Sequence, residues 1–87
     1  MNFNEAIKVF SSKFPDLIVT RCIDYDEQHF VIEAIKDLIR SDYNNPYYAV
    51  GKNDKRITGF IPSLDLDEFF NAIENRTVYQ NRWYYGM

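Results

Sequence analysis

The chain has 87 residues, 46% of them hydrophobic and 26% charged, which is the composition of an ordinary globular protein and the length of a single domain, residues 1–87. Its formal net charge is -3, which would repel a phosphate backbone, so we expect no nucleic-acid partner. One Cys and one His cannot form an internal disulfide or a structural zinc site, and we expect no cofactor or metal.

No apolar segment at the N-terminus resembles a signal peptide, and no apolar run approaches the roughly 20 residues that span a bilayer. The single cysteine is typical of a protein from a reducing compartment. We therefore expect a cytoplasmic protein that does not associate with membranes.

The first predicted element is a helix over residues 3–13. Asn2 followed three residues later by Glu5 resembles a capping box, and apolar residues then recur at helical spacing as far as Phe14. Pro15 ends this helix because the residue before a proline is pushed out of the α conformation.

A strand is predicted next, over residues 17–23, where β-branched side chains are frequent and a polar turn follows. Residues 29–39 fit two patterns, since their apolar positions match a helical stripe and also the alternation of a strand. Helical periodicity alone favours a helix there. We favour a strand at 29–35 instead, because antiparallel pairing with 17–23 makes one face of the hairpin almost wholly apolar.

The predicted register of this hairpin places Ile23 opposite His29. Cys22 and His29 then project from opposite faces, so Cys22 is interpreted as a small apolar core residue and not as a nucleophile activated by the imidazole. On the other face Glu33 lies diagonal to Arg21, where the opposite charges can meet.

A second hairpin is predicted from strands at 47–50 and 57–61, joined by a turn rich in Gly, Asn and Asp, and residues 41–46 before it have the composition of a loop. A second helix is predicted over 66–74, because Asp65 and Glu68 supply an acidic N-terminal cap. Its apolar face, which must be covered, consists of Leu66, Phe69, Phe70 and Ile73.

Residues 77–87 form either a last strand or an aromatic tail. Together these elements predict an α+β fold, in which an N-terminal helix and a C-terminal helix flank a small antiparallel sheet of three to four strands.

Two acidic clusters and one basic turn are interpreted as solvated features and not as ligand sites. The acids at 24–27 lack the glycine and the terminal Glu of an EF-hand loop, and those at 65–68 suit the positive end of a helix. The turn at 51–56 has basic side chains but no Walker spacing. The sequence therefore predicts no catalytic, cofactor-binding or metal-binding residues.

The C-terminal segment is the candidate partner-binding site. Trp, Tyr and Arg dominate interface hot spots, and four aromatic residues lie within the seven positions 79–85. The same rings would equally complete the core of a small domain. The candidate partner-binding residues are Tyr79, Arg82, Trp83, Tyr84 and Tyr85.

The segment 46–62 has an aromatic residue, a Val and a Lys before its turn, and a Phe and a Pro after it. These features are carried by Pro46, Tyr47, Tyr48, Ala49, Val50, Gly51, Lys52, Ile57, Thr58, Gly59, Phe60, Ile61 and Pro62. The pattern resembles small proteins of Gram-positive bacteriophages and mobile elements, in which the second strand leads into the final helix. Those proteins mostly lack assigned activities, so the resemblance implies a bacterial host cell and no catalytic residues.

An aromatic-rich chain without catalytic motifs is interpreted as a non-enzymatic protein-binding module, a phage-encoded or host inhibitor or adaptor that acts on a bacterial protein. A second hypothesis is a minor phage assembly or virion component whose C-terminal segment adds to a neighbouring subunit. A third is a small-ligand sensor. Self-association would separate the first two, and the sequence leaves open whether the chain forms a homo-oligomer.

Overall fold

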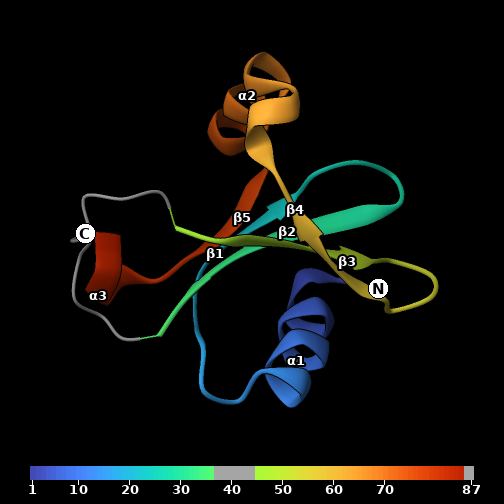
Figure 1. Cartoon of the computed structure of the whole chain (residues 1–87), viewed down its shortest axis with the longest axis vertical. Coiled ribbons are helices and arrows are strands. Elements are labelled where there is room, and N and C mark those ends of the chain that lie inside the picture. The colour runs from blue at the N-terminus through green and yellow to red at the C-terminus, as the bar shows by residue number, and fades with distance from the viewer. Residues whose placement is uncertain (37–44, 86–87) are drawn as a thin grey trace.

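The computed structural model describes residues 1–36 and 45–85. In chain order its elements are α1 (Phe3–Lys13), β1 (Ile18–Asp24), β2 (His29–Ile35), β3 (Tyr47–Gly51), β4 (Ile57–Phe60), the 3-10 helix η1 (Pro62–Leu64), α2 (Leu66–Arg76), β5 (Thr77–Gln80) and α3 (Arg82–Tyr85). The five strands form one antiparallel sheet of order β4-β3-β2-β1-β5, and α1 and α2 lie on its opposite sides (Figure 1).

This architecture confirms the α+β prediction, with five strands where three to four were expected. The additional strand is β5, one of the two alternatives for the C-terminal segment, and it pairs with β1. Within the described ranges no helix combines the length and the apolar character that a membrane-spanning segment needs. The loop expected at 41–46 lies mostly outside the described residues, which resume at Asn45.

Both long helices begin with the predicted caps. The side chain of Asn2 accepts a hydrogen bond from the backbone amide of Glu5 at 2.9 Å. Asp65 accepts one from the amide of Glu68 at 3.1 Å. These caps satisfy amides that have no partner inside the helix, and thereby set where each helix starts.

The hairpin of β1 and β2 is confirmed, and the helix that periodicity alone favours at 30–39 is wrong for its described part. The predicted register is wrong by two residues, because Ile23 lies opposite Val31 and not opposite His29. His29 instead closes the turn, where its carbonyl accepts hydrogen bonds from the amides of Tyr25 and Asp26. A shift of two residues leaves the side chains next to the turn on their predicted faces.

A β-bulge at Thr20 changes the register a second time. Val19 and Cys22 both join the cluster under α1, so the bulge turns Thr20 and Arg21 toward the side of α2. Arg21 consequently lies directly opposite Glu33, where the sequence analysis placed it diagonally.

The sheet has an apolar cluster on each face, because helices cover both. Between the sheet and α1 lie Ala6, Phe10, Val19, Cys22, Phe30, Ile32, Ala34 and Val50. Between the sheet and α2 lie Ile23, Val31, Phe69 and Ala72. The strand β2 contributes to both clusters, and all of its residues after His29 are buried.

Cys22 is a fully buried residue of the first cluster, and burial, together with the nearby charge of Asp24, raises the pKa of its thiol to about 12. We predict that Cys22→Ala lowers the free energy of unfolding by about 1 kcal/mol, measured by urea denaturation, because it removes a small buried side chain. In the native protein the thiol should resist alkylation by iodoacetamide, and in urea it should react. Rapid alkylation of the native protein would contradict this placement.

Candidate functional site

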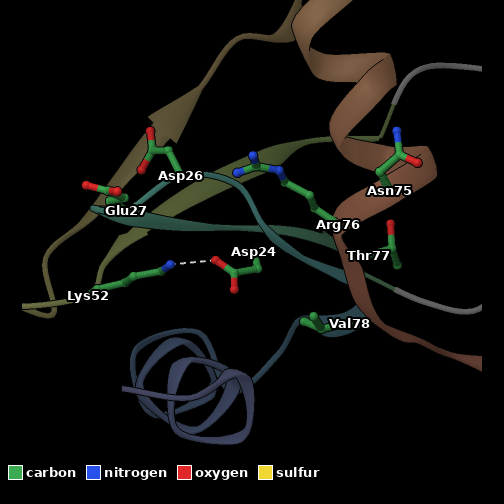
Figure 2. A pocket seen from close by; sticks show the side chains of 8 residues that line it. All are labelled: Asp24, Asp26, Glu27, Lys52, Asn75, Arg76, Thr77 and Val78. Atoms are coloured by element: carbon green, nitrogen blue, oxygen red, sulfur yellow. Dashed lines mark hydrogen bonds and ion pairs between the residues drawn. The ribbon is translucent and has the colours of Figure 1, made fainter.

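A charged pocket lies where three chain reversals meet (Figure 2). It has a volume of about 420 Å³, and its walls come from the turn after β1, from Lys52 after β3 and from the junction of α2 with β5. The lining residues are Asp24, Asp26, Glu27, Lys52, Asn75, Arg76, Thr77 and Val78. Five of these eight residues carry charged side chains.

Most charged groups of this pocket hold the loops together. Lys52 forms an ion pair with Asp24, and its Nζ lies 4.8 Å from the centre of the Phe30 ring. Arg76 donates a hydrogen bond from Nη1 to the carbonyl oxygen of Tyr25 at 3.0 Å. These contacts connect β1, the turn after β3 and α2. We therefore interpret the charged groups of this pocket as stabilising the fold and not as a ligand site.

Asp26 is also engaged inside the protein. Burial acts to raise the pKa of Asp26, but hydrogen bonds from the amides of Gln28 and His29 and from the His29 imidazole outweigh it, so the pKa lies below its usual value. Nowhere in the described ranges do three or more His, Cys, Asp or Glu side chains gather in a way that could hold a metal ion. Cys22 and His29 project from opposite faces of the hairpin, as expected, since Cys22 lies opposite Ile32.

An apolar groove with a volume of about 460 Å³ lies along α2 from Leu66 to Ile73, whereas the charged pocket lies at the C-terminal end of this helix. We call it the α2 groove, and define it by Arg21, Asn45, Tyr47, Ile61, Pro62, Leu66, Phe69, Phe70 and Ile73. Its apolar walls come from α2, from Ile61 and from Pro62 at the start of η1, and its polar residues come from the sheet and from Asn45. A few polar groups at one part of a mostly apolar cavity is the usual character of a binding site.

Beneath the polar part of the groove lies the buried carboxylate of Glu33, which is 3% exposed. Thr20 Oγ1 lies 2.6 Å from one carboxylate oxygen, and the hydroxyl of Tyr47 donates to the other at 2.7 Å. Arg21 and Tyr47 are the cross-strand neighbours of Glu33 on β1 and β3. The charge is therefore enclosed by polar partners, as burial of a carboxylate requires.

These contacts also perturb Tyr47. Burial, the hydrogen bond to Glu33 and the charge of Glu33 raise the pKa of the Tyr47 hydroxyl well above its usual value. A perturbed titratable group in a cavity indicates a functional site, although networks that stabilise the fold perturb pKa values in the same way. Here the hydroxyl is engaged by Glu33, which indicates a structural role.

The C-terminal aromatic residues do not form a single exposed surface. Trp83 is 87% exposed and Arg82 is exposed, whereas Tyr84 is 6% exposed and its hydroxyl accepts a hydrogen bond from Asn45 at 2.8 Å. Tyr79 packs against the cluster under α1. Tyr85 ends α3, and its side chain lies outside the described part of the structure.

The α2 groove was not predicted from the sequence, because the apolar face of α2 was expected to be covered. Phe69 is 3% exposed and lies in the core, but Phe70 is 56% exposed and Leu66 is about half exposed. A signal was present in the sequence, since adjacent residues of a helix point about 100° apart, and Phe69 and Phe70 cannot both face one narrow core.

Comparison of the chain with protein-family models, with curated protein sequences and with solved structures gave no match. The function is therefore inferred from the exposed side chains and cavities of the chain itself.

We predict that Tyr47→Phe lowers the free energy of unfolding by about 1–3 kcal/mol, because it removes a hydrogen bond from the buried carboxylate of Glu33. Thr20→Val should have a similar effect, and the double variant should show coupling between the two sites, measured by urea denaturation of all four proteins. Additive effects would show that the two hydroxyls do not share the carboxylate.

The same network predicts a dependence on alkaline pH. Tyrosine ionises near pH 10 in an unfolded chain, and the folded pKa of Tyr47 is higher, so its contribution to stability is complete below about pH 10 and is lost as the pH rises beyond that value. Tyr47→Phe should lose less stability than the wild type over this range. An equal loss in both proteins would contradict the raised pKa.

Trp83 and Tyr84 provide a matched pair of neighbours in α3. We predict that Trp83→Ala leaves the melting temperature within about 2 °C of the wild type, because its ring packs on little of the protein. Tyr84→Ala should lower the melting temperature clearly, because it leaves a cavity and removes the hydrogen bond with Asn45. Equal losses in the two variants, measured by differential scanning calorimetry, would show that Trp83 also packs in the core.

Proposed function

We propose that this chain is a non-enzymatic protein-binding module, a phage-encoded or host inhibitor or adaptor that acts on a protein of the bacterial cytoplasm. The observation that supports this best is the α2 groove, where Ile61, Leu66 and Phe70 expose large apolar side chains beside an apolar cavity. Apolar side chains gathered in this way on a soluble protein mark a surface that binds another molecule.

The charges around the groove indicate the chemistry of the partner. Asp67 and Glu74 are exposed, and they lie three residues before and four residues after Phe70, so they are its neighbours on the helix surface. Asp65 at the N-cap and Glu68 in the first turn of the helix add further exposed acids. The complementary partner presents an apolar side chain flanked by Lys or Arg.

We expect binding energy to be concentrated at Phe70. A partner side chain that enters the groove would cover the exposed part of this ring, and a ring desolvated only in the complex is typical of a hot spot. The acidic neighbours would contribute mainly to the association rate and to discrimination between partners. Trp83, the exposed ring of α3, is a second candidate anchor at a separate place on the chain.

A small-ligand sensor is the second candidate, and the volume of the groove favours it. About 460 Å³ falls in the range of small-molecule sites, and the lining includes the polar residues Asn45 and Tyr47. Binding of a small molecule would depend on these polar groups as well as on Phe70. Binding of a protein would depend on Phe70 and on the surrounding acids.

We predict that Phe70→Ala weakens partner binding by about 2 kcal/mol or more, roughly 30-fold, while unfolding changes by no more than about 0.5 kcal/mol. Phe69→Ala is the matched control, because the same truncation at a buried position should cost about 3–5 kcal/mol of stability. Partners are captured from a bacterial lysate on the wild type and on Phe70→Ala, and the contact surface is mapped by amide chemical shifts.

The proposal requires a captured protein that is retained by the wild type, is lost with Phe70→Ala, and shifts amides of the groove. Asp67→Asn with Glu74→Gln should slow association and reduce its dependence on salt. A captured protein that binds Phe70→Ala as tightly as the wild type would place the interface elsewhere on the chain.

A further inference from the structure

The strand β4 forms one edge of the sheet and is regular along its length. Its four residues pair with β3 in an uninterrupted register, and Ile61 continues the extended conformation with φ -114 and ψ 103. Natural proteins protect such edges with charged residues, prolines or bulges. The segment 57–61 has none of these, whereas the pairing of β5 at the other edge is interrupted by a register shift and the chain turns into α3 one residue after it.

Gly59 lies at the middle of this edge, and the chain itself does not require a glycine there. A Cβ at this position would meet no atom within 4 Å, and the backbone does not have the positive φ that favours glycine. Glycine weakens a strand, and in an edge it often marks a place where another backbone approaches. Gly59 leaves the backbone of the exposed edge without a side chain to shield it.

The backbone groups of alternate residues of β4 point away from the sheet. Gly51 donates its amide to the carbonyl of Arg56 at 2.9 Å, which makes residues 56, 58 and 60 the positions that bond to β3. The amides and carbonyls of Ile57 and Gly59 and the amide of Ile61 then face outward, whereas the carbonyl of Ile61 accepts a hydrogen bond from the amide of Leu64 at 3.3 Å. Three outward residues in an extended segment are sufficient to pair with one further strand.

We propose that a second copy of this chain pairs with this edge, with the two β4 strands antiparallel and Gly59 opposite Gly59 of the second copy. This register pairs Ile57 with the second copy's Ile61, so the amide and carbonyl of Gly59, the carbonyl of Ile57 and the amide of Ile61 each gain a partner. Because the same surface is used twice, the contact is symmetric and closes at two copies. The two sheets become one sheet that continues across both copies.

The charges at the two ends of the edge suit this occupant. Arg56 precedes the strand, and Asp65 follows it in a cavity of about 220 Å³ that Gly59, Phe60, Ile61, Pro62 and Leu64 also line. Antiparallel pairing places Arg56 of each copy opposite Pro62 of the other, on the face where this cavity lies. Each exposed Arg56 thus meets the acidic start of α2 on the other copy, and two such contacts form. A strand that pairs here needs a basic residue before its apolar residues and an acidic residue after them. The segment around β4 itself has this order of charges, which favours a second copy over an unrelated peptide.

A charged side chain in place of Gly59 would lie beside the two-fold axis of the proposed dimer, opposite the same side chain of the second copy. Gly59→Lys and Gly59→Asp should each fold, because a side chain there extends into open space, and folding is checked by circular dichroism and thermal unfolding. We expect wild-type protein to approach twice its 10.4 kDa mass as its concentration rises toward about 1 mM, measured by analytical ultracentrifugation. Each variant alone should dissociate at least about tenfold more readily, because like charges then lie directly opposite each other. An equal mixture of the two variants should associate again, since Lys then faces Asp.

Wild-type protein that remains monomeric at about 1 mM would overturn the proposal, as would association that both variants retain unchanged. Loss in both variants without recovery in the mixture would show that Gly59 does not face its copy. If a variant fails to fold, amide exchange is measured on the wild-type protein. The amides of Gly59 and Ile61 must exchange at least about tenfold more slowly at associating than at dilute concentrations. Association does not depend on Phe70, so Phe70→Ala should leave it unchanged and separates this inference from partner binding at the α2 groove.

Discussion

The fold depends on the way a carboxylate is accommodated at the centre of its sheet. Glu33 lies on the middle strand, and an isolated charge there would cost several kcal/mol. Hydroxyls of Thr20 and Tyr47 contact its two oxygens, and Arg21 lies opposite it on β1. The bulge brings the hydroxyl of Thr20 to the α2 side, so residues of the two neighbouring strands, β1 and β3, surround the carboxylate in a single register.

Both faces of the sheet are covered, and this explains the composition of the chain. A short chain has few residues with which to build two apolar layers, and aromatic rings supply large areas for each of them. Under α1 the rings of Phe10, Phe14 and Tyr48 lie 5.0 to 5.6 Å apart. On the other side Tyr47 meets Phe69 edge to face at 4.9 Å. Much of the aromatic excess therefore serves packing. Among the side chains that the structure describes, Phe70 and Trp83 are the exposed rings.

The surfaces of the protein differ in how many of their side chains and backbone groups already have contacts within the chain. The charged pocket uses its Lys, Arg and Asp side chains to join loops. The α2 groove leaves Phe70 and Leu66 partly in water, and the β4 edge leaves its outward backbone groups without a neighbouring strand in the described sheet. A surface that gains apolar burial or hydrogen bonds only with another molecule is the place to expect function. Both surfaces are the ones on which the two proposals of protein association rest.

The sequence by itself determined the local structure, because caps, proline and turn residues act within a few positions: Asn2, Pro15 and Asp65 set the ends of helices where they were predicted. It did not determine the register of the first hairpin. Turn composition does not specify which residue closes the turn, and here His29 does so through the amides of Tyr25 and Asp26. The Thr20 bulge depends on a contact with Glu33, which is distant in the sequence. The helical periodicity of 29–39 was misleading because β2 is buried on both faces and loses the alternation of an ordinary strand. Which of Phe69 and Phe70 is buried was likewise decided by where α2 crosses the sheet, a property of the assembled layers that no local pattern encodes.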